Sequence, residues 1–488
     1  MTYQGCWAIQ SLKCTKNFLC PFFYFVFGSF GCFFGKNFIL FFLYLLLIFL
    51  IFIVSGQKEV VIMEVYRKIW QELDMDVEKH ELILTRLPNA YQRVFLTQKN
   101  RPKAMEYYDY IISELHKLRI KELYDFKAQG GKVVGAFCLY LPQELVLASG
   151  AVFVGLCGGS NFTVPIAEQF LPRNICPLIK SSFGFKLSRV CPYFQSSDLL
   201  VGETTCDGKK KVYELLGNIC STYTVELPQK PETIQSREMF LKELKQLASK
   251  LEELTGNRIT VESLKNAIEM VNAKREVLER LNNTRKAVPP PISGKDALLI
   301  NQISINDEIQ RFIRKTSELV EELEERVRKG VGVVDADAPR IMVSGCPMAI
   351  PNWKLHNIVE NSGAVIVVEE SCVGTRFLNM GKVDSSANDL DGLLKSIVDA
   401  CLNIHCACFT PNNGRINDII QLAKDFKVDG VIHYSLQTCH DYNIEARKVE
   451  RALKRINIPM LTVETDYSEE DIGQLTTRVE AFLEILKK

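Results

Sequence analysis

Short β-branched runs alternate with amphipathic stretches from about residue 133 onward. In the first half of the chain this pattern predicts helices over 142–149 and 209–216, between strands over 133–138, 151–156, 199–205 and 222–227. Strands that alternate with helices of these lengths predict a parallel sheet, whose functional loops lie at the carboxyl ends of the strands.

A charged segment with leucines three and four residues apart separates this half from a second one. It predicts helices over 236–285 and 296–328, interrupted by three prolines at 289–291. After a hinge at Gly330 and Gly332 the pattern of short apolar runs resumes. It predicts helices over 414–426, 443–455 and 473–486, and strands over 340–344, 364–368, 430–436 and 459–464.

The fold class expected from these patterns is α/β, with two doubly wound parallel-sheet domains joined by a helical segment, plus an N-terminal apolar segment. The expected divisions are an apolar segment over 1–62, a helical region over 63–130, a first α/β domain over 131–235, a helical linker region over 236–330 and a second α/β domain over 331–488.

The N-terminal segment differs in composition from the remaining chain. It holds an uninterrupted apolar run of 17 residues from Phe38 to Val54, close to the shortest stretch that spans a hydrocarbon core as a helix. The lysines that precede this run predict a membrane anchor with the body exported. Export conflicts with a body rich in free thiols, which suits a reducing compartment. We therefore expect a cytoplasmic protein whose native start is Met63, with a membrane anchor as the alternative if residues 1–62 are translated.

Composition narrows the function. A net charge of +1 and the lack of an arginine-rich stripe argue against a nucleic-acid partner. The 16 cysteines are widely spaced, unlike the dense disulfide framework of a small secreted domain. Metal ligation or redox chemistry is therefore the better hypothesis, although free cysteines also pack well in hydrophobic cores.

Five cysteines fall at the carboxyl ends of predicted strands, where a parallel sheet places its functional loops: Cys138, Cys206, Cys346, Cys372 and Cys439. Core packing alone would scatter them over helix faces and strand interiors. Turn-forming residues beside cysteines, as in the sequence Gly-Cys-Pro at 345–347, expose backbone amides that stabilise thiolates and cluster sulfide. Zinc is disfavoured because no pair of Cys-x2-Cys knuckles is present, and the close pair Cys406-Ala-Cys408 is by itself a weak signal.

Three segments resemble the 2-hydroxyacyl-CoA dehydratase D-component family. They are Cys-Pro-Leu-Ile-Lys-Ser-Ser-Phe-Gly-Phe at 176–185, Val-Gly-Glu-Thr-Thr-Cys-Asp-Gly-Lys-Lys-Lys at 201–211, and Glu-Thr-Asp-Tyr-Ser at 464–468 with Gly473-Gln474 and Thr477-Arg478. The resemblance extends from about residue 120 to the C-terminus. It implies an oxygen-sensitive iron–sulfur enzyme.

The resemblance leaves two branches open. Dehydratase subunits work as heterodimers with a single 4Fe–4S cluster per subunit, whereas double-cubane reductases carry two bridged cubanes in one chain. The number of cysteines in family-like contexts favours the double-cubane branch. The resemblance implies as cluster ligands Cys138, Cys176, Cys206, Cys346, Cys372 and Cys439, with Cys191 and Cys408 in reserve. Cys157, Cys220 and Cys401 are expected inside strands or helices as core residues.

The family also implies partners. An ATP-dependent homodimeric iron–sulfur activator supplies low-potential electrons, which agrees with the absence of a phosphate-binding Gly-x4-Gly-Lys-Ser/Thr loop here. The substrate is a small molecule in the double-cubane branch or an acyl-CoA in the dehydratase branch. The expected assembly is a homodimer, or a heterodimer for a dehydratase subunit. A non-enzymatic cluster scaffold or electron carrier is a second alternative.

Two residues are candidate catalytic groups beside the expected ligands. Glu144 begins a predicted helix, where it faces the cluster or places a negative charge at the helix terminus. His440 is a candidate proton donor next to Cys439, or a structural hydrogen-bonding group. Lys209, Lys210 and Lys211 attract a CoA phosphate or an acidic activator surface, or form a solvated helix start.

Overall fold

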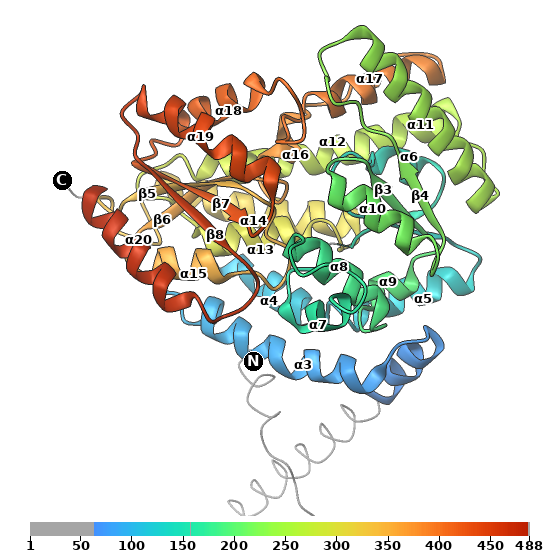
Figure 1. The fold of residues 1–488 in the computed structure, drawn as a ribbon, viewed down its shortest axis with the longest axis horizontal. Helices are drawn as coiled ribbons and strands as arrows, with labels where there is room; N and C mark the ends of the chain where they lie inside the picture. The colour runs from blue at the N-terminus through green and yellow to red at the C-terminus, as the bar shows by residue number, and fades with distance from the viewer. Residues whose placement is uncertain (1–62, 157, 487–488) are drawn as a thin grey trace, which may run out of the picture.

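The computed structural model describes residues 63–156 and 158–486. It contains two four-stranded parallel sheets with helices between the strands, so the predicted α/β class is confirmed (Figure 1). The predicted apolar segment over 1–62 lies outside the described residues. None of the helices within the described ranges is long and apolar enough to cross a membrane.

The first sheet has the strand order β2-β1-β3-β4. Its strands β1 and β3 are buried along their whole length, which explains why their sequences are continuous apolar runs. Its strands are β1 (Val133–Ala136), β2 (Val152–Gly155), β3 (Leu199–Glu203) and β4 (Thr222–Val225). Its helices are α6 (Gln143–Ala148), α7 (Val164–Ala167), α8 (Pro177–Leu187), α9 (Pro192–Ser196) and α10 (Asp207–Leu216).

The second sheet repeats this topology with the order β6-β5-β7-β8. In both sheets the chain changes direction between the first and third strands, the position at which open parallel sheets bind ligands. Its strands are β5 (Arg340–Gly345), β6 (Val365–Glu370), β7 (Gly430–Leu436) and β8 (Met460–Thr465). Its helices are α15 (Lys354–Asn361), α16 (Arg376–Asn379), α17 (Leu390–Leu402), α18 (Asn413–Asp425), α19 (His440–Lys454) and α20 (Ile472–Leu486).

The segment between the sheets forms four helices: α11 (Ile234–Thr255), α12 (Val261–Thr284), α13 (Gly294–Ile303) and α14 (Ile309–Arg328). The segment predicted to be helical over 236–285 forms two helices, α11 and α12, because Gly256 ends α11 with a left-handed φ of 75°. The predicted helix over 296–328 is likewise broken between α13 and α14. Helix α12 contacts α6 as well as α16 and α17, so this segment packs against both sheet units.

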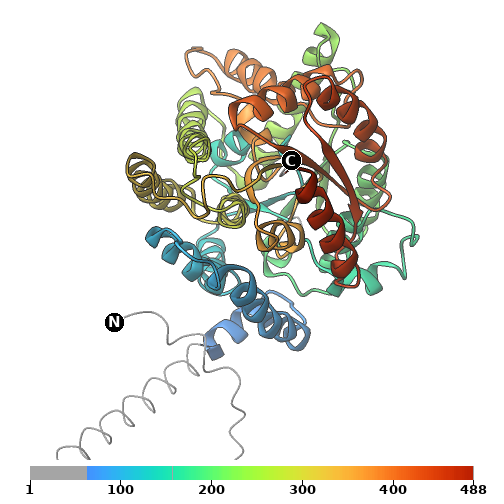
Figure 2. The same cartoon turned by 90° about the vertical axis from the view of Figure 1, so that its left-hand side faces the viewer.

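The N-terminal part of the described chain is helical. It comprises a helix over 63–72, then α3 (Val77–Tyr91), the short helices η2 (Gln92–Leu96) and η3 (Lys103–Met105), α4 (Glu106–Glu114) and α5 (Leu118–Ala128). These helices, blue in the ribbon, lie along one side of the molecule in both views (Figure 1, Figure 2). Helix α4 packs against α13, which joins this region to the central helices.

Candidate thiol site and adjoining cavity

Cysteines follow equivalent strands of the two sheets. In the first sheet Cys138 lies two residues after β1, and Cys206 is the N-cap of α10, which follows β3. In the second sheet Cys346 directly follows β5, and Cys439 is the N-cap of α19, which follows β7. All four therefore lie at the position where each sheet reverses its strand order.

Four thiols form a first group, which we call the distal thiols: Cys176, Cys206, Cys346 and Cys439. The Cys439 thiol shares hydrogen bonds with those of Cys176 and Cys346, and Cys206 lies within electrostatic range of Cys176. Two of these residues follow strands of the second sheet and two belong to the first unit. The distal thiols are therefore assembled from both halves of the chain.

Backbone amides point at the sulfur atoms of the distal thiols. The Leu436 N–H donates to Cys346 Sγ over 3.4 Å, and the Tyr442 N–H donates to Cys439. Cys176 caps α8, whose first amides donate to it in the same way. Such donors favour the thiolate form and are typical of sites that bind metal through sulfur.

Gly345 makes the turn into Cys346 possible. Its φ is 145°, and a Cβ atom there would lie 1.8 Å from the carbonyl oxygen of Tyr434. The close approach allows the Cys346 N–H to donate to this oxygen at 2.9 Å. Any side chain at position 345 would push Cys346 away from β7.

Four further thiols form a second group, the cavity-side thiols: Cys138, Cys372, Cys406 and Cys408. The side chains of Cys406 and Cys408 hydrogen-bond to each other, and Cys138 lies within electrostatic range of Cys372 and Cys406. The hydrogen bond from Cys408 lowers the pKa of Cys406 to about 5, whereas burial raises the pKa of Cys372. Cys138 comes from the first unit and the other three from the second.

Two charged residues lie between the groups. Lys209, in the first turn of α10, is within electrostatic range of Cys138, Cys206 and Cys372. Burial and the charge of Cys406 raise the pKa of Asp441 to about 6, and Asp441 also acts on Cys206. The distal and cavity-side thiols are therefore neighbours.

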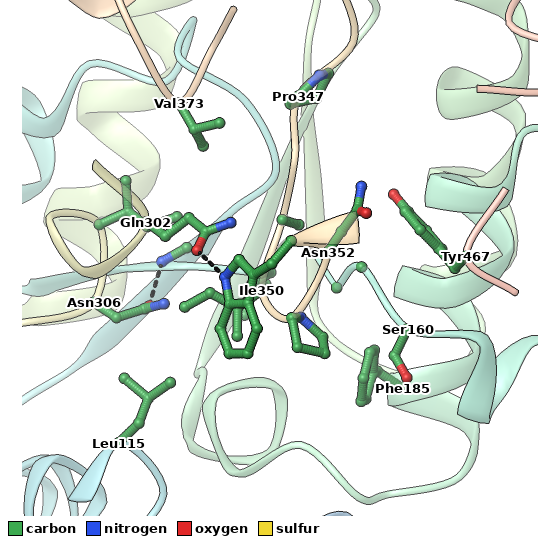
Figure 3. A pocket seen from close by; sticks show the side chains of 18 of the residues that line it. Leu115, Ser160, Phe185, Gln302, Asn306, Pro347, Ile350, Asn352, Val373 and Tyr467 are labelled. Atoms are coloured by element: carbon green, nitrogen blue, oxygen red, sulfur yellow. Dashed lines mark hydrogen bonds between the residues drawn. The ribbon is translucent and has the colours of Figure 1, made fainter. Parts of the chain in front are cut away.

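A cavity of about 1170 Å³ opens beside the cavity-side thiols, and Cys138 and Cys372 are among the residues that line it. Its other walls come from the loop after β5, from α3 and from the segment before α14. In Figure 3 the side chain of Gln302 lies at this cavity and accepts a hydrogen bond of 2.8 Å from the indole of Trp353. The cavity is thus enclosed by both sheet units and by the helices between them.

The candidate catalytic residue Glu144 lines this cavity and is fully buried. Its Oε1 accepts a hydrogen bond of 2.6 Å from Arg275, a residue of α12, while its Oε2 has no hydrogen-bond partner among the described residues. The Arg275 guanidinium lies over the ring of Phe377. Glu144 is therefore held by a buried cation with one oxygen directed to no protein group.

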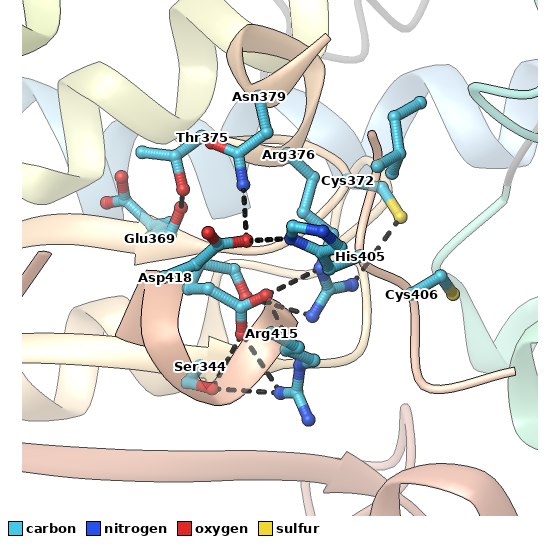
Figure 4. Close-up of polar contacts among 12 residues, drawn as sticks. Ser344, Glu369, Cys372, Thr375, Arg376, Asn379, His405, Cys406, Arg415 and Asp418 are labelled. Atoms are coloured by element: carbon cyan, nitrogen blue, oxygen red, sulfur yellow. Dashed lines mark hydrogen bonds and ion pairs between the residues drawn. The ribbon is translucent and has the colours of Figure 1, made fainter. Parts of the chain in front are cut away.

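A buried network of charged side chains lies behind the cavity-side thiols (Figure 4). Glu370, the last residue of β6, forms ion pairs with Arg376 and Arg415 at 2.7 and 2.9 Å. Arg376 reaches to 3.8 Å from Cys372 Sγ, and the Tyr442 hydroxyl lies 3.8 Å from Cys406 Sγ. Polar groups thus lie beside the sulfur atoms of Cys372 and Cys406.

The six cysteines implied as ligands are all placed in the two thiol groups. Of the reserves, Cys408 lies with the cavity-side thiols, whereas the resolved partners of Cys191 are Lys186 and backbone amides. Cys401 is buried in the core as expected. Cys220 is not inside an element but between α10 and β4, with its thiol donating to the Leu216 carbonyl. Cys157 lies outside the described residues.

Three further candidate residues from the sequence, His440, Lys210 and Lys211, lie at the surface. His440 is exposed at the start of α19 and is not among the described residues that line the cavity. Lys210 and Lys211 form surface ion pairs with Asp207 and Glu214, which fits the solvated helix start. Cys406, Arg376 and Tyr442 were not singled out from the sequence, although the Cys-x-Cys spacing was a signal for the first of them.

No group of three or more His, Cys, Asp and Glu side chains within 63–156 and 158–486 is arranged as a site for a single metal ion. The ligands of a cubane cluster bind different iron atoms and lie farther apart than the ligands of one ion. The arrangement of the two thiol groups therefore suits a polynuclear cluster and not a single metal ion.

Comparison with known proteins gives a consistent result. A sequence profile of the family described as 2-hydroxyglutaryl-CoA dehydratase, D-component, matches residues 138–486. The chain is 35% identical to "Putative dehydratase subunit YjiM" of Escherichia coli (strain K12), over 77% of this chain and 96% of that protein. It is 23% identical to the (R)-phenyllactyl-CoA dehydratase beta subunit of Clostridium sporogenes, over 73% of this chain and 92% of that one. It is 19% identical to a benzoyl-CoA reductase subunit of Thauera aromatica, over 68% and 84%.

Proposed function

Because the chain belongs to the 2-hydroxyglutaryl-CoA dehydratase D-component family, we propose that it is a double-cubane-type iron–sulfur reductase. In this proposal the cavity-side and distal thiols together hold a pair of cubane clusters. An ATP-dependent homodimeric iron–sulfur activator delivers low-potential electrons, and a small molecule bound in the cavity is reduced. The observation that carries the proposal is the convergence of thiols from both sheets into two adjacent groups.

The donor chemistry supports an iron–sulfur cluster. Thiolates are the usual ligands of cubane clusters, and amide hydrogen bonds to sulfur together with burial set their potential. Both features are present, since Cys346 is buried, the other seven thiols are half-buried, and backbone amides donate to Cys176, Cys346 and Cys439. When bound, such a cluster supplies one-electron transfer at low potential.

The chain's own residues have separate tasks in this proposal. Lys209 places a positive charge between the two thiol groups and offsets the negative charge of the thiolates. Glu144, with one unpartnered oxygen at the cavity, holds or releases a proton beside the bound substrate, and Arg275 fixes its orientation. His440, exposed beside Cys439, is proposed to exchange protons with solvent.

The names of the relatives support a second candidate. A dehydratase beta subunit is among them, so the chain is alternatively one subunit of a (R)-2-hydroxyacyl-CoA dehydratase, a lyase with a single 4Fe–4S cluster, an acyl-CoA substrate and a sister subunit. A further alternative is an electron carrier or cluster scaffold without catalysis. The large cavity lined by Cys138 and Cys372 favours an enzyme over a carrier, which needs no such space.

Iron and sulfide content per chain tests the proposal. Protein purified without oxygen should hold about eight iron atoms if two cubanes are bound and about four if there is one. Replacing a distal thiol, Cys346→Ala, should then remove about half of the iron, because the cavity-side thiols are left intact. The matched control is Cys191→Ala, which removes another half-buried thiol and should leave the iron content unchanged.

The outcomes separate the candidates. About four iron atoms in the unaltered protein would favour the dehydratase subunit, as for a single cubane. Protein without iron would contradict the double-cubane and dehydratase proposals together. An equal loss of iron in Cys191→Ala and Cys346→Ala would contradict the assignment of the thiol groups.

A further inference from the structure

The ion network behind the cavity-side thiols is closed off from solvent. Glu370, Arg376 and Arg415 each expose no more than 1% of their surface. Ser344 donates a further hydrogen bond of 2.7 Å to Glu370. Although burial opposes ionisation, Arg376 and Arg415 lower the pKa of Glu370 to about 2, so the network stays charged.

The direction of the hydrogen bonds follows from donor chemistry. Arginine has donors and no acceptor, so the contact between Arg376 Nη1 and the Tyr442 hydroxyl places an arginine proton on the phenol oxygen. The phenol's own proton is then directed elsewhere, and Cys406 Sγ lies 3.8 Å away. The same Nη1 lies 3.8 Å from Cys372 Sγ. A cysteine that binds a cluster is a thiolate without a proton, so under the proposed function Arg376 and the Tyr442 phenol are the donors of these two contacts to sulfur.

Tyr442 is fixed in this orientation. The guanidinium groups of Arg376 and Arg415 both lie over its ring, at 5.1 and 5.0 Å from the ring centre. Glu445 balances the second charge of the pair through an ion pair with Arg415. The phenol is therefore a preorganised donor.

We propose that Arg376 and Tyr442 are positioning residues that donate hydrogen bonds to the sulfur atoms of Cys372 and Cys406 and raise the reduction potential of the cluster bound there. This inference rests on the proposed function. Reduction adds a negative charge to the cluster and its thiolates, and a donor to sulfur stabilises the reduced form more than the oxidised form. Without these donors the cavity-side cluster is harder to reduce.

Tyr442 also joins the two thiol groups. It is the third residue of α19, and its backbone N–H donates to Cys439 of the distal thiols, while its hydroxyl faces Cys406 of the cavity-side thiols. Removing the hydroxyl leaves the backbone donor in place. The variant Tyr442→Phe should therefore alter one of two reduction steps and leave the other unchanged.

A redox titration followed by electron paramagnetic resonance tests this on the iron-loaded protein and on Tyr442→Phe. One hydrogen bond is worth a factor of about five in an equilibrium constant, so one step should move by about 40 mV to more negative potential, with iron content unchanged. The control Tyr108→Phe also removes a buried phenol, one that bonds to Thr316 at 2.8 Å and not to sulfur. Tyr108→Phe should leave the potentials of both reduction steps unchanged.

A second measurement uses the unaltered sequence. Exchange into deuterium oxide should shift the iron–sulfur stretching frequencies, and part of that shift should be missing in Tyr442→Phe. Identical potentials and identical deuterium shifts in the two proteins would overturn the inference while leaving the proposed function intact. A protein that binds no iron would instead overturn the proposed function on which it rests.

Discussion

Arg285 and Glu369 are buried ionic residues that hold each other in place. Arg285, at the end of α12, donates to both oxygens of Glu369 at 2.6 and 2.8 Å, and His356 lies 3.2 Å from the same carboxylate. Burial opposes the charge of Glu369, but Arg285 and His356 lower its pKa to about 2. Because Arg285 belongs to the helical segment and Glu369 to β6, this ion pair links the helical segment to the second sheet.

The variant Glu369→Gln should reduce the free energy of unfolding by about 3–5 kcal/mol, since Arg285 is left as an uncompensated buried charge. Urea denaturation measures the loss. In the original protein, stability should fall as the pH drops from about 4.3, the carboxyl value in an unfolded chain, towards the folded pKa of about 2. The variant should show a weaker pH dependence in this range.

A suitable control is Glu253→Gln, which removes the charge of an exposed pair with Lys250. Exposed pairs contribute about 0–1 kcal/mol, so this change should be nearly silent. Equal losses for the two variants would show that the Arg285 pair adds no more than a surface pair.

At the level of elements, the strands were predictable and several helices were not. The strands of both sheets are short runs rich in apolar and β-branched residues, and their ends agree with the prediction to within a few residues. Helix α8 was missed because it is buried on all sides from Pro177 to Phe185 and so lacks the alternation of polar and apolar faces. Helix ends set by a left-handed residue, as at Gly256, were also missed.

The residues of the candidate site were likewise predictable from the sequence only in part. Cys138, Cys206, Cys346 and Cys439 were found because strand ends of parallel sheets share an edge. Cys406 was undervalued because it lies in an irregular loop after α17, where no periodic pattern exists. Contacts between residues far apart in the sequence, such as Arg376 with Tyr442, depend on packing that a single sequence does not display.

The turn between α11 and α12 provides a test at this scale. Gly256→Ala should lower the free energy of unfolding by about 1 kcal/mol, because the left-handed φ of 75° is costly for any residue with a Cβ atom. A Cβ atom there would meet no neighbour within 4 Å, so crowding contributes nothing.

The comparison is Gly473→Ala, at a position in α20 that is equally open but has no positive φ. That change should stabilise the protein by about 0.5–1 kcal/mol through helix propensity. Thermal denaturation distinguishes the two variants, because the midpoint should fall for Gly256→Ala and rise for Gly473→Ala. A stabilising Gly256→Ala would contradict the role assigned to the turn.

Considered as a whole, the molecule places its thiols where its two sheet units meet. Each thiol group takes members from both units, and the cavity is walled by both units together with α3 and α12. Under the proposed function, a bound cluster therefore fastens one unit to the other. Stability and metal content should change together.

Removal of iron by an anaerobic chelator tests this coupling. A ligand present at a hundredfold excess over its Kd stabilises by about 2.7 kcal/mol, so for a chain of this length the midpoint of thermal unfolding should fall by about 3 °C. Hydrogen exchange should rise in the loops that carry Cys372 and Cys406 and stay unchanged in α11, which carries none of the thiols. An unchanged midpoint would show that the units hold together without the metal.

The distribution of the thiols along the chain also sets an order of events during biosynthesis. The cavity-side thiols are complete once the ribosome has passed Cys408, and the distal thiols are complete only at Cys439. A nascent polypeptide that carries the first sheet alone presents Cys138, Cys176 and Cys206 without their counterparts. Under the proposed function, the cellular machinery that inserts iron and sulfide must therefore act once both sheet units have been synthesised.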